Sequence, residues 1–189
     1  MQSFLISLSS VAIAEMGDRT QLLSLMLAAR FRRPWPILAG ILCATLANHA
    51  VAALIGQRLG RSLTPRLLDC AVGISMVAMA LWSLRPDTLE EASPGGARRG
   101  AFLATLISFF VAEIGDKTQI ATIALAAAYS NLPMVVAGTT TGMLLANAPV
   151  VFFGKAFSAR ISLKPLRYVA SAVFLALGLF FLAHALTAA

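Results

Sequence analysis

The chain has 189 residues, of which 59% are hydrophobic and only 12% are charged. Soluble domains carry about 25% charged residues, so this composition leaves too little polar surface for an ordinary soluble protein. Lys and Arg outnumber Asp and Glu by 15 to 8, a formal net charge of +7. Because the basic residues fall mainly in short loops between apolar runs, they indicate orientation in a membrane, and no nucleic-acid partner is predicted.

Six apolar segments follow one another along the chain, each long enough for the roughly 20 residues that cross a bilayer core as a helix. They are Ser3–Ala29, Pro34–Gln57, Leu67–Leu84, Ala101–Ala128, Leu132–Gly154 and Leu166–Leu186. Lipid permits only helices or closed barrels, and apolar runs of this length are too long for barrel strands. The predicted fold class is all-α: a polytopic protein with six transmembrane helices in a lipid bilayer.

The first segment also has one feature of a secretory signal peptide, because Ala12–Ala14 fits an A-x-A cleavage site. No Lys or Arg precedes the apolar run, however, and the residues that follow the supposed cleavage site recur later in the chain. We therefore expect the first segment to be kept as a membrane span.

An eight-residue motif occurs twice, once in the first segment and once in the fourth. Its copies are Ala14-Glu15-Met16-Gly17-Asp18-Arg19-Thr20-Gln21 and Ala112-Glu113-Ile114-Gly115-Asp116-Lys117-Thr118-Gln119, identical at six of eight positions. Later positions correspond as well, including Asn48 with Asn147. We predict a first three-helix repeat over 1–86, a linker over 87–100 and a second repeat over 101–189.

Three spans in each repeat are an odd number, so the second repeat has to enter the membrane from the opposite side. Such inverted repeats are common in secondary transporters, whose sites lie near the midplane. The loops on one side hold Arg30, Arg32, Arg33, Arg85, Arg98, Arg99, Lys155, Arg160, Lys164 and Arg167, and those on the other hold Arg58, Arg61 and Arg66. The positive-inside rule therefore places the linker in the cytoplasm and both termini outside.

The motif places four acids and two bases inside predicted spans. On a continuous helix, Glu15, Asp18 and Arg19 would share one face, and the second copy would repeat this arrangement. Each charge costs about 2.5–3.5 kcal/mol at the bilayer centre, so these side chains are expected to face the bundle interior. Local ion pairs, Glu15 with Arg19 and Glu113 with Lys117, are the structural alternative.

The formal charge of the two motifs together is −2, which matches one divalent cation or two protons. Carboxylate, amide and hydroxyl oxygens suit hard ions such as Mn²⁺, Ca²⁺ and Mg²⁺. The candidate metal ligands are the acids Glu15, Asp18, Glu113 and Asp116. The other polar motif residues are expected to support them: Arg19, Thr20, Gln21, Lys117, Thr118 and Gln119.

Other residues have open roles. Gly17 and Gly115 remove a side chain beside each acid, which permits close helix packing or local unwinding. Asn48 and Asn147 either give amide oxygens to the ion or form hydrogen bonds between helices. His49 has no counterpart in the second repeat and is either a proton relay or a core residue.

Both motif copies fit the E-x-G-D-[KR]-[TS] signature, and over its whole length the chain resembles the calcium/manganese:cation antiporter-2 family. The resemblance implies that the Glu and Asp of both copies bind the cation. It implies export of Mn²⁺, with Ca²⁺ as the other candidate, out of the cytoplasm in exchange for protons across a bacterial inner membrane. A transporter of this kind is not an enzyme and has no resident cofactor, because the metal ion is bound only in transit.

Two other functions remain as alternatives. The first is export of another cationic solute such as a basic amino acid, which the paired acids could hold but Arg19 and Lys117 would repel. The second is intramembrane aspartyl proteolysis, whose G-x-G-D element needs glycine where Glu15 and Glu113 stand.

Overall fold

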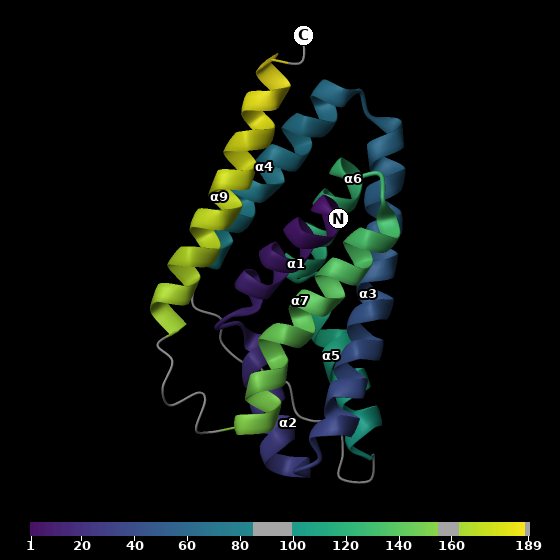
Figure 1. The fold of residues 1–189 in the computed structure, drawn as a ribbon, viewed down its shortest axis with the longest axis vertical. Helices are drawn as coiled ribbons and strands as arrows, with labels where there is room; N and C mark the ends of the chain where they lie inside the picture. The colour runs from purple at the N-terminus through teal and green to yellow at the C-terminus, as the bar shows by residue number, and fades with distance from the viewer. Residues whose placement is uncertain (85–99, 155–162, 188–189) are drawn as a thin grey trace.

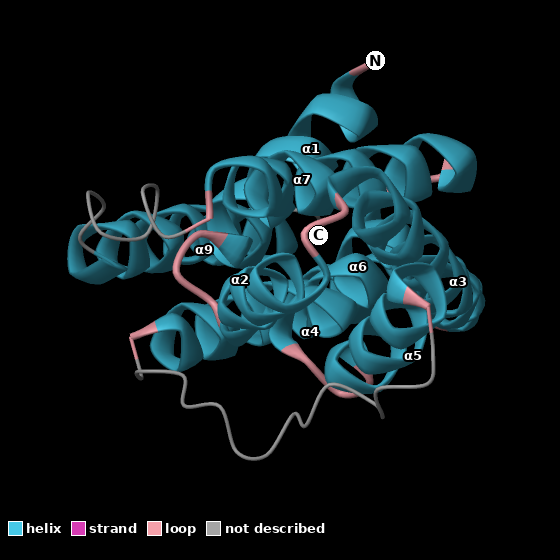
Figure 2. Cartoon of the chain, turned by 90° about the horizontal axis from the view of Figure 1, so that it is seen from below, coloured by secondary structure: helices cyan, strands magenta, loops and turns pink. Residues whose placement is uncertain are grey.

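The computed structural model describes residues 1–84, 100–154 and 163–187, so residues 87–99 of the predicted linker lie outside the described residues. Several basic loop residues used for the orientation, such as Arg85 and Lys155, lie outside them too. In the described residues every regular element is a helix and none is a strand (Figures 1 and 2). The helices are α1 (Gln2–Glu15), α2 (Arg19–Phe31), α3 (Pro34–Ser62), α4 (Pro65–Ser83), α5 (Ala101–Glu113), α6 (Lys117–Ala128), α7 (Leu132–Phe153) and α9 (Leu163–Thr187). The predicted all-α fold class is confirmed.

Four of the described helices are long and apolar enough to cross a membrane, namely α3, α4, α7 and the Tyr168–Thr187 part of α9. Large apolar side chains on their outer faces are exposed, for example Val51, Leu54 and Leu81, each more than half accessible. A helical surface of this kind is suited to contact with lipid, because its backbone polar groups are satisfied within the helix.

The first and fourth predicted segments are not single helices. α1 ends at Glu15 and α2 begins at Arg19, and in the same way α5 ends at Glu113 and α6 begins at Lys117. The prediction of one continuous helix in each segment is therefore wrong. Glu15 and Asp18 do not share one helix face, since they lie on opposite sides of a break.

Glycine is the physical reason for both breaks. Gly17 and Gly115 have φ values of +85° and +74°, in the left-handed region that residues with a Cβ atom rarely adopt. The residue after each glycine, Asp18 or Asp116, is extended and occupies the N-cap position of the next helix. Of the two roles left open for these glycines, local unwinding is observed.

α1 and α2 follow each other along α7. Phe4 and Ser7 of α1 lie against Gly138 near the start of α7, and Gln21 of α2 donates a hydrogen bond to the carbonyl oxygen of Ala146 farther along it. A methyl group added at Gly138 would lie 2.5 Å from the carbonyl oxygen of Phe4. The glycine thus allows the two backbones to touch, as small residues do between membrane helices.

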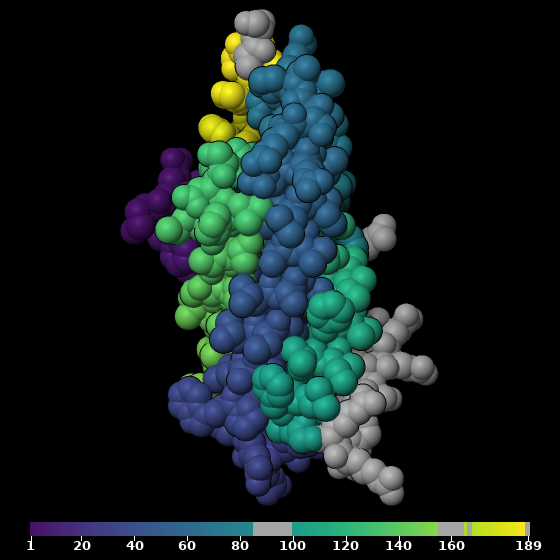
Figure 3. Space-filling view, turned by 90° about the vertical axis from the view of Figure 1, so that its right-hand side faces the viewer, coloured from purple at the N-terminus to yellow at the C-terminus, as the bar shows by residue number. Residues whose placement is uncertain are grey.

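α5 and α6 follow α3 in the same way. Gly40 of α3 lies against Phe102 and Thr105 of α5, and Gly56 lies against Ile123 of α6. Figure 3 shows α3 running along most of the molecule, with α7 on one side and α5 on the other. The broken helix pair of the first half, α1 and α2, therefore packs on α7, and that of the second half, α5 and α6, packs on α3.

α4 and α9 form a separate antiparallel pair at the side of the bundle (Figure 1). Gly73 of α4 lies against Gly178 and Leu182 of α9. Near one end of the pair, Asp69 Oδ2 lies 2.8 Å from Nδ1 of His184. Asp69 is thus in the first turns of α4, near the end of the bundle and away from the breaks.

The apolar core is shared between the two halves of the chain. One buried cluster joins Met76 of α4 to Leu125 of α6, and a second joins Leu23 of α2 to Phe109 of α5. Each cluster contains buried residues from before and after the predicted linker. Close packing of these residues therefore places the two breaks next to each other in the described structure.

Candidate cation site

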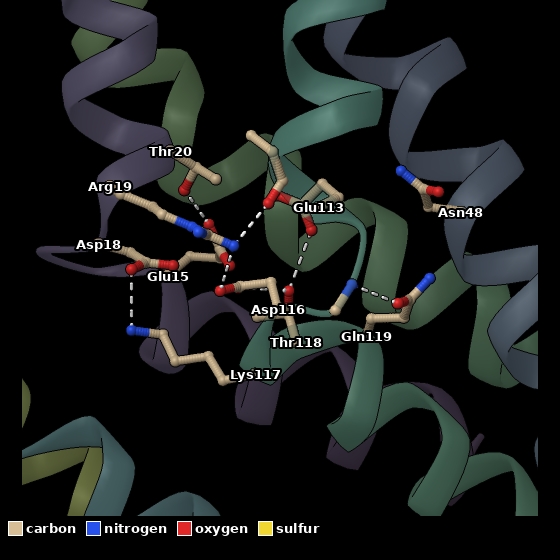
Figure 4. A network of polar contacts seen from close by, with 12 residues as sticks. Glu15, Asp18, Arg19, Thr20, Asn48, Glu113, Asp116, Lys117, Thr118 and Gln119 are labelled. Carbon is tan, nitrogen blue, oxygen red and sulfur yellow. Dashed lines mark hydrogen bonds and ion pairs between the residues drawn. The ribbon is translucent and has the colours of Figure 1, made fainter. Parts of the chain in front are cut away.

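The two helix breaks bring the side chains of the repeated motif together (Figure 4). Glu15, Glu113 and Asp116 each offer a carboxylate oxygen, and these oxygens all lie within 4.8 Å of one another. All three acids are buried. The structure thus gathers three of the four predicted ligands into one carboxylate cluster, while Asp18 is buried nearby but is not a member.

Ion pairs connect the two breaks to each other. Arg19 Nη2 lies 2.9 Å from Asp116 Oδ1, and Lys117 Nζ lies 2.9 Å from Asp18 Oδ1. The alternative of local pairs, in which each base meets the glutamate of its own motif, is therefore wrong. The break is the reason, because the spacing of four residues that joins two side chains on a helix does not hold across it.

The two threonines reach back across the breaks. Thr20 Oγ1 donates to Glu15 Oε2, and Thr118 Oγ1 donates to Glu113 Oε2 at 3.0 Å. In the part of the chain that is described, Oε1 of both glutamates is buried without a hydrogen-bond partner. Each glutamate therefore has one oriented oxygen and one that can accept a further ligand.

The two glutamines stabilise the unwound backbone. The N–H of Gly17 donates to Gln21 Oε1 at 2.8 Å, and the N–H of Gly115 donates to Gln119 Oε1 at 2.8 Å. These bonds satisfy N–H groups at the break with a side chain, which matters because unpaired backbone groups are costly in a membrane interior. The glutamines therefore support the shape of the site through its backbone.

Asn48 and Asn147 both form hydrogen bonds between helices. Asn48 Nδ2 donates to the carbonyl oxygen of Phe110, and Asn147 Oδ1 accepts from Ser24 Oγ at 2.7 Å. In Figure 4, Asn48 lies on α3, separated from the carboxylates. The interhelical alternative is thus observed, and a direct role of either amide in cation binding stays a prediction.

Ser24 and His49 are two of the other polar residues buried in the interior. Ser24 was not among the predicted residues, although it lies three positions after Gln21, as Thr122 does after Gln119, so alignment of the repeats would have found it. His49 is fully buried, and its ring nitrogens have no hydrogen-bond partner among the described residues. A proton-relay role for His49 stays a prediction.

The helix ends add to the electrostatics of the site. Glu15 and Glu113 are the last residues of α1 and α5, where the helix dipole places partial negative charge that favours a nearby cation. Four acids against two bases leave a formal charge of −2 at the two breaks. Carboxylate and hydroxyl oxygens without sulfur or imidazole ligands suit hard divalent ions better than soft ones.

Comparison with known proteins is consistent with this chemistry. A family model described as "Divalent cation/proton antiporter GDT1" matches residues 3–91 and 101–189. A Vibrio cholerae protein named "Putative manganese exporter" is 49% identical over 180 residues, covering 95% of this chain and 90% of that protein. A GDT1-like protein of Synechocystis is 29% identical over 195 residues, covering 92% and 93%. GDT1-like protein 4 of Oryza sativa is 25% identical over 203 residues, covering 94% and 72%. No solved structure matches the chain.

Proposed function

Because the chain belongs to the GDT1 family of divalent cation/proton antiporters, we propose that it exports Mn²⁺ from the cytoplasm in exchange for protons. The observation that carries this proposal is the carboxylate cluster formed by Glu15, Glu113 and Asp116 at the two breaks. The name of the Vibrio cholerae relative favours Mn²⁺ as the cargo. Ca²⁺ is the second candidate, since it takes the same oxygen ligands.

The three clustered acids are the proposed ligands in the described conformation. Their donor atoms converge from two distant parts of the chain, and Oε1 of Glu15 and of Glu113 has no hydrogen-bond partner among the described residues. Asp18 is proposed as the fourth site acid, because it occupies the position in the first motif that Asp116 has in the second. Discontinuous helices whose ends meet at a cation are a recurrent feature of secondary transporters.

The membrane arrangement that suits this site has six spans in two inverted repeats. In this proposal α1 with α2 forms one span and α5 with α6 another, since each pair follows a long helix of the other half. The double match of the family model, over 3–91 and 101–189, supports a division into two repeats. The charge count of the loops supports termini outside and a cytoplasmic linker in a bacterial inner membrane.

Proton exchange follows from charge balance at the site. The formal charge of −2 at the two motifs is neutralised either by one divalent cation or by two protons. A site that alternates between these occupants exports metal on one stroke and carries protons inward on the other. Alternating access around a fixed midplane site is the usual way in which inverted repeats achieve this exchange.

Reconstituted vesicles provide the test. The purified protein should take up radiolabelled Mn²⁺ into vesicles when a pH gradient is imposed, and Glu15→Gln or Glu113→Gln should abolish this uptake. Asp69→Asn is the matched control, because Asp69 pairs with His184 at the side of the bundle, away from the cluster. Wild-type transport by either glutamine variant would exclude a shared site built from both motifs.

Export of a basic amino acid is one of the two alternatives, and the same vesicles test it. An ammonium or guanidinium group carries one positive charge and would neutralise only half of the formal charge of −2 at the two motifs. Labelled lysine and arginine should therefore not enter the same vesicles. Uptake of either one, with no uptake of Mn²⁺ or Ca²⁺, would favour the alternative.

A further inference from the structure

The basic residue of the first motif contacts an acid that the cation needs. Arg19 Nη2 lies 2.9 Å from Asp116 Oδ1, and Asp116 is one of the three clustered acids. The guanidinium group and a bound metal ion are both positive and repel each other when they share one carboxylate. A cation at the cluster therefore competes with Arg19 for the negative charge of Asp116.

The basic residue of the second motif contacts the acid outside the cluster. Lys117 Nζ lies 2.9 Å from Asp18 Oδ1, and Asp18 is not among the three clustered acids. The side chain of Lys117 is 5% exposed, whereas that of Arg19 is 37% exposed. The two pairs are equivalent in sequence but differ in the structure: the pair at the cluster has the accessible base, and the other pair is enclosed.

Arg19 also links the two helix ends of the second break. Its Nη2 donates to the carbonyl oxygen of Ala112 at 2.6 Å, in the last turn of α5, and to Asp116 directly before α6. When Arg19 leaves Asp116, these two helix ends lose a partner that they share. The position of Arg19 therefore couples occupancy of the carboxylate cluster to the geometry of the break.

We propose that Arg19 and Lys117 are the counter-cations of the empty carrier and that the transported metal displaces one of them in each conformation. This inference rests on the proposed function. In the described conformation the metal displaces Arg19 from Asp116, while Lys117 keeps Asp18 apart. If the two repeats swap roles in the opposite conformation, the metal there displaces Lys117 from Asp18, and Arg19 stays paired with Asp116. Glu15 and Glu113 then serve both conformations, and the two aspartates alternate.

The physical advantage concerns the carrier without metal. Buried acids that have lost both metal and counter-cation would be uncompensated charges inside a membrane, which is a costly arrangement. With Arg19 and Lys117 in place, the metal-free carrier that returns with protons keeps its aspartates paired while it changes conformation. Removing one base should therefore strengthen metal binding and slow the return of the empty carrier.

The test compares Arg19→Gln with Arg19→Lys, which retains the charge. Mn²⁺ affinity of the purified protein is measured by titration calorimetry. Two modes are then measured in vesicles: net Mn²⁺ export into metal-free buffer, and exchange of labelled for unlabelled Mn²⁺. Exchange does not require the empty carrier to return.

Arg19→Gln should bind Mn²⁺ about tenfold more tightly, as expected when one charge-assisted competitor is removed. It should retain exchange and lose most net export, while Arg19→Lys should behave like the wild type. Equal loss of both transport modes, or an unchanged or weaker affinity, would overturn the inference. Absence of exchange in the wild type would instead refute the proposed function itself.

Lys117→Gln provides an independent second variant. Because Asp18 lies outside the carboxylate cluster in the described conformation, this variant should lose net export and retain exchange, and its Mn²⁺ affinity should rise by no more than that of Arg19→Gln. Loss of exchange or a weaker affinity would exclude alternating aspartates. If neither glutamine variant gives a folded, monodisperse protein, both bases are structural and the inference fails.

Discussion

The N–H of Gly17 donates a 2.8 Å hydrogen bond to Oε1 of Gln21, and Gly115 and Gln119 repeat this bond in the second half of the chain. The motif therefore encodes its own break: the glycine supplies the left-handed backbone, and the glutamine four residues later accepts the N–H that unwinding exposes. We expect both elements to be required for the carboxylates to converge.

Gly17→Ala tests the backbone requirement. An alanine at φ +85° is strained by roughly 1–2 kcal/mol, so the thermal stability of the purified protein should fall and transport should fall with it. Gly100→Ala is the control, because Gly100 has φ −59° and open space where a methyl group would be added. Equal stability of the two variants would show that the left-handed glycine is not required.

Thr118→Val tests how the glutamates are oriented. The substitution keeps the shape of the side chain but removes the hydroxyl that donates to Glu113 at 3.0 Å and to Asp116 at 3.3 Å. Loss of a hydrogen bond to a charged group, worth about 1.5–3 kcal/mol, should weaken Mn²⁺ affinity about tenfold or more. Thr118→Ser retains the hydroxyl and should restore most of the affinity measured by calorimetry.

Gly138→Ala tests the contact between α1 and α7. The added methyl group would lie 2.5 Å from the carbonyl oxygen of Phe4, so the helices must move apart. Overpacking of this kind typically costs about 1–3 kcal/mol. Gly40→Ala, at the corresponding position of α3, should lower the unfolding temperature similarly. Unchanged unfolding temperatures for both would contradict the close approach.

Proton exchange predicts a pH-dependent metal affinity. If Mn²⁺ and protons compete for the same carboxylates, binding of Mn²⁺ releases protons into a weakly buffered solution. Because fewer protons compete at higher pH, the apparent affinity should rise as pH increases through neutrality. Asp18→Asn combined with Asp116→Asn should remove most of this dependence, because Arg19 and Lys117 can then neutralise the glutamates in place of protons. A flat affinity without proton release would favour coupling to a different ion.

Reporter fusions test the orientation. A reporter active only outside the cytoplasm should work when it is fused after Ala189, and a cytoplasmic reporter should work when it is inserted within 88–97. The reason is the excess of basic residues in the loops on the linker side. The opposite pattern would reverse the proposed direction of export.

Hydropathy and the repeat predict the helical fold class and single out the motif. They do not predict that the backbone unwinds within it. The segments over 3–29 and 101–128 read as continuous apolar runs because a hydropathy window averages over a single glycine. The left-handed φ of Gly17 depends on backbone torsion, which composition does not report. Helical spacing then assigned Arg19 to the wrong partner.

Sequence separation limited the prediction of the site in a different way. The contact between Lys117 and Asp18 spans 99 positions, and no local period indicates a pairing of that range. Symmetry of the motifs also predicts equal roles for both halves, whereas Arg19 is far more accessible than Lys117. The exposure of each base depends on the elements packed around it, which the motif alone does not report.

The packing of α5 and α6 on α3 has a consequence for biogenesis. While the ribosome is still making the second half, glycines of α3 such as Gly40 and Gly56 lack the α5 and α6 residues that they contact in the folded protein. The helices of the first half therefore remain incompletely packed in the bilayer, accessible to chaperones and proteases, until the second half has been inserted. A chain truncated at its midpoint is left without half of each buried cluster, and quality control should remove it unless the missing half is supplied as a separate polypeptide.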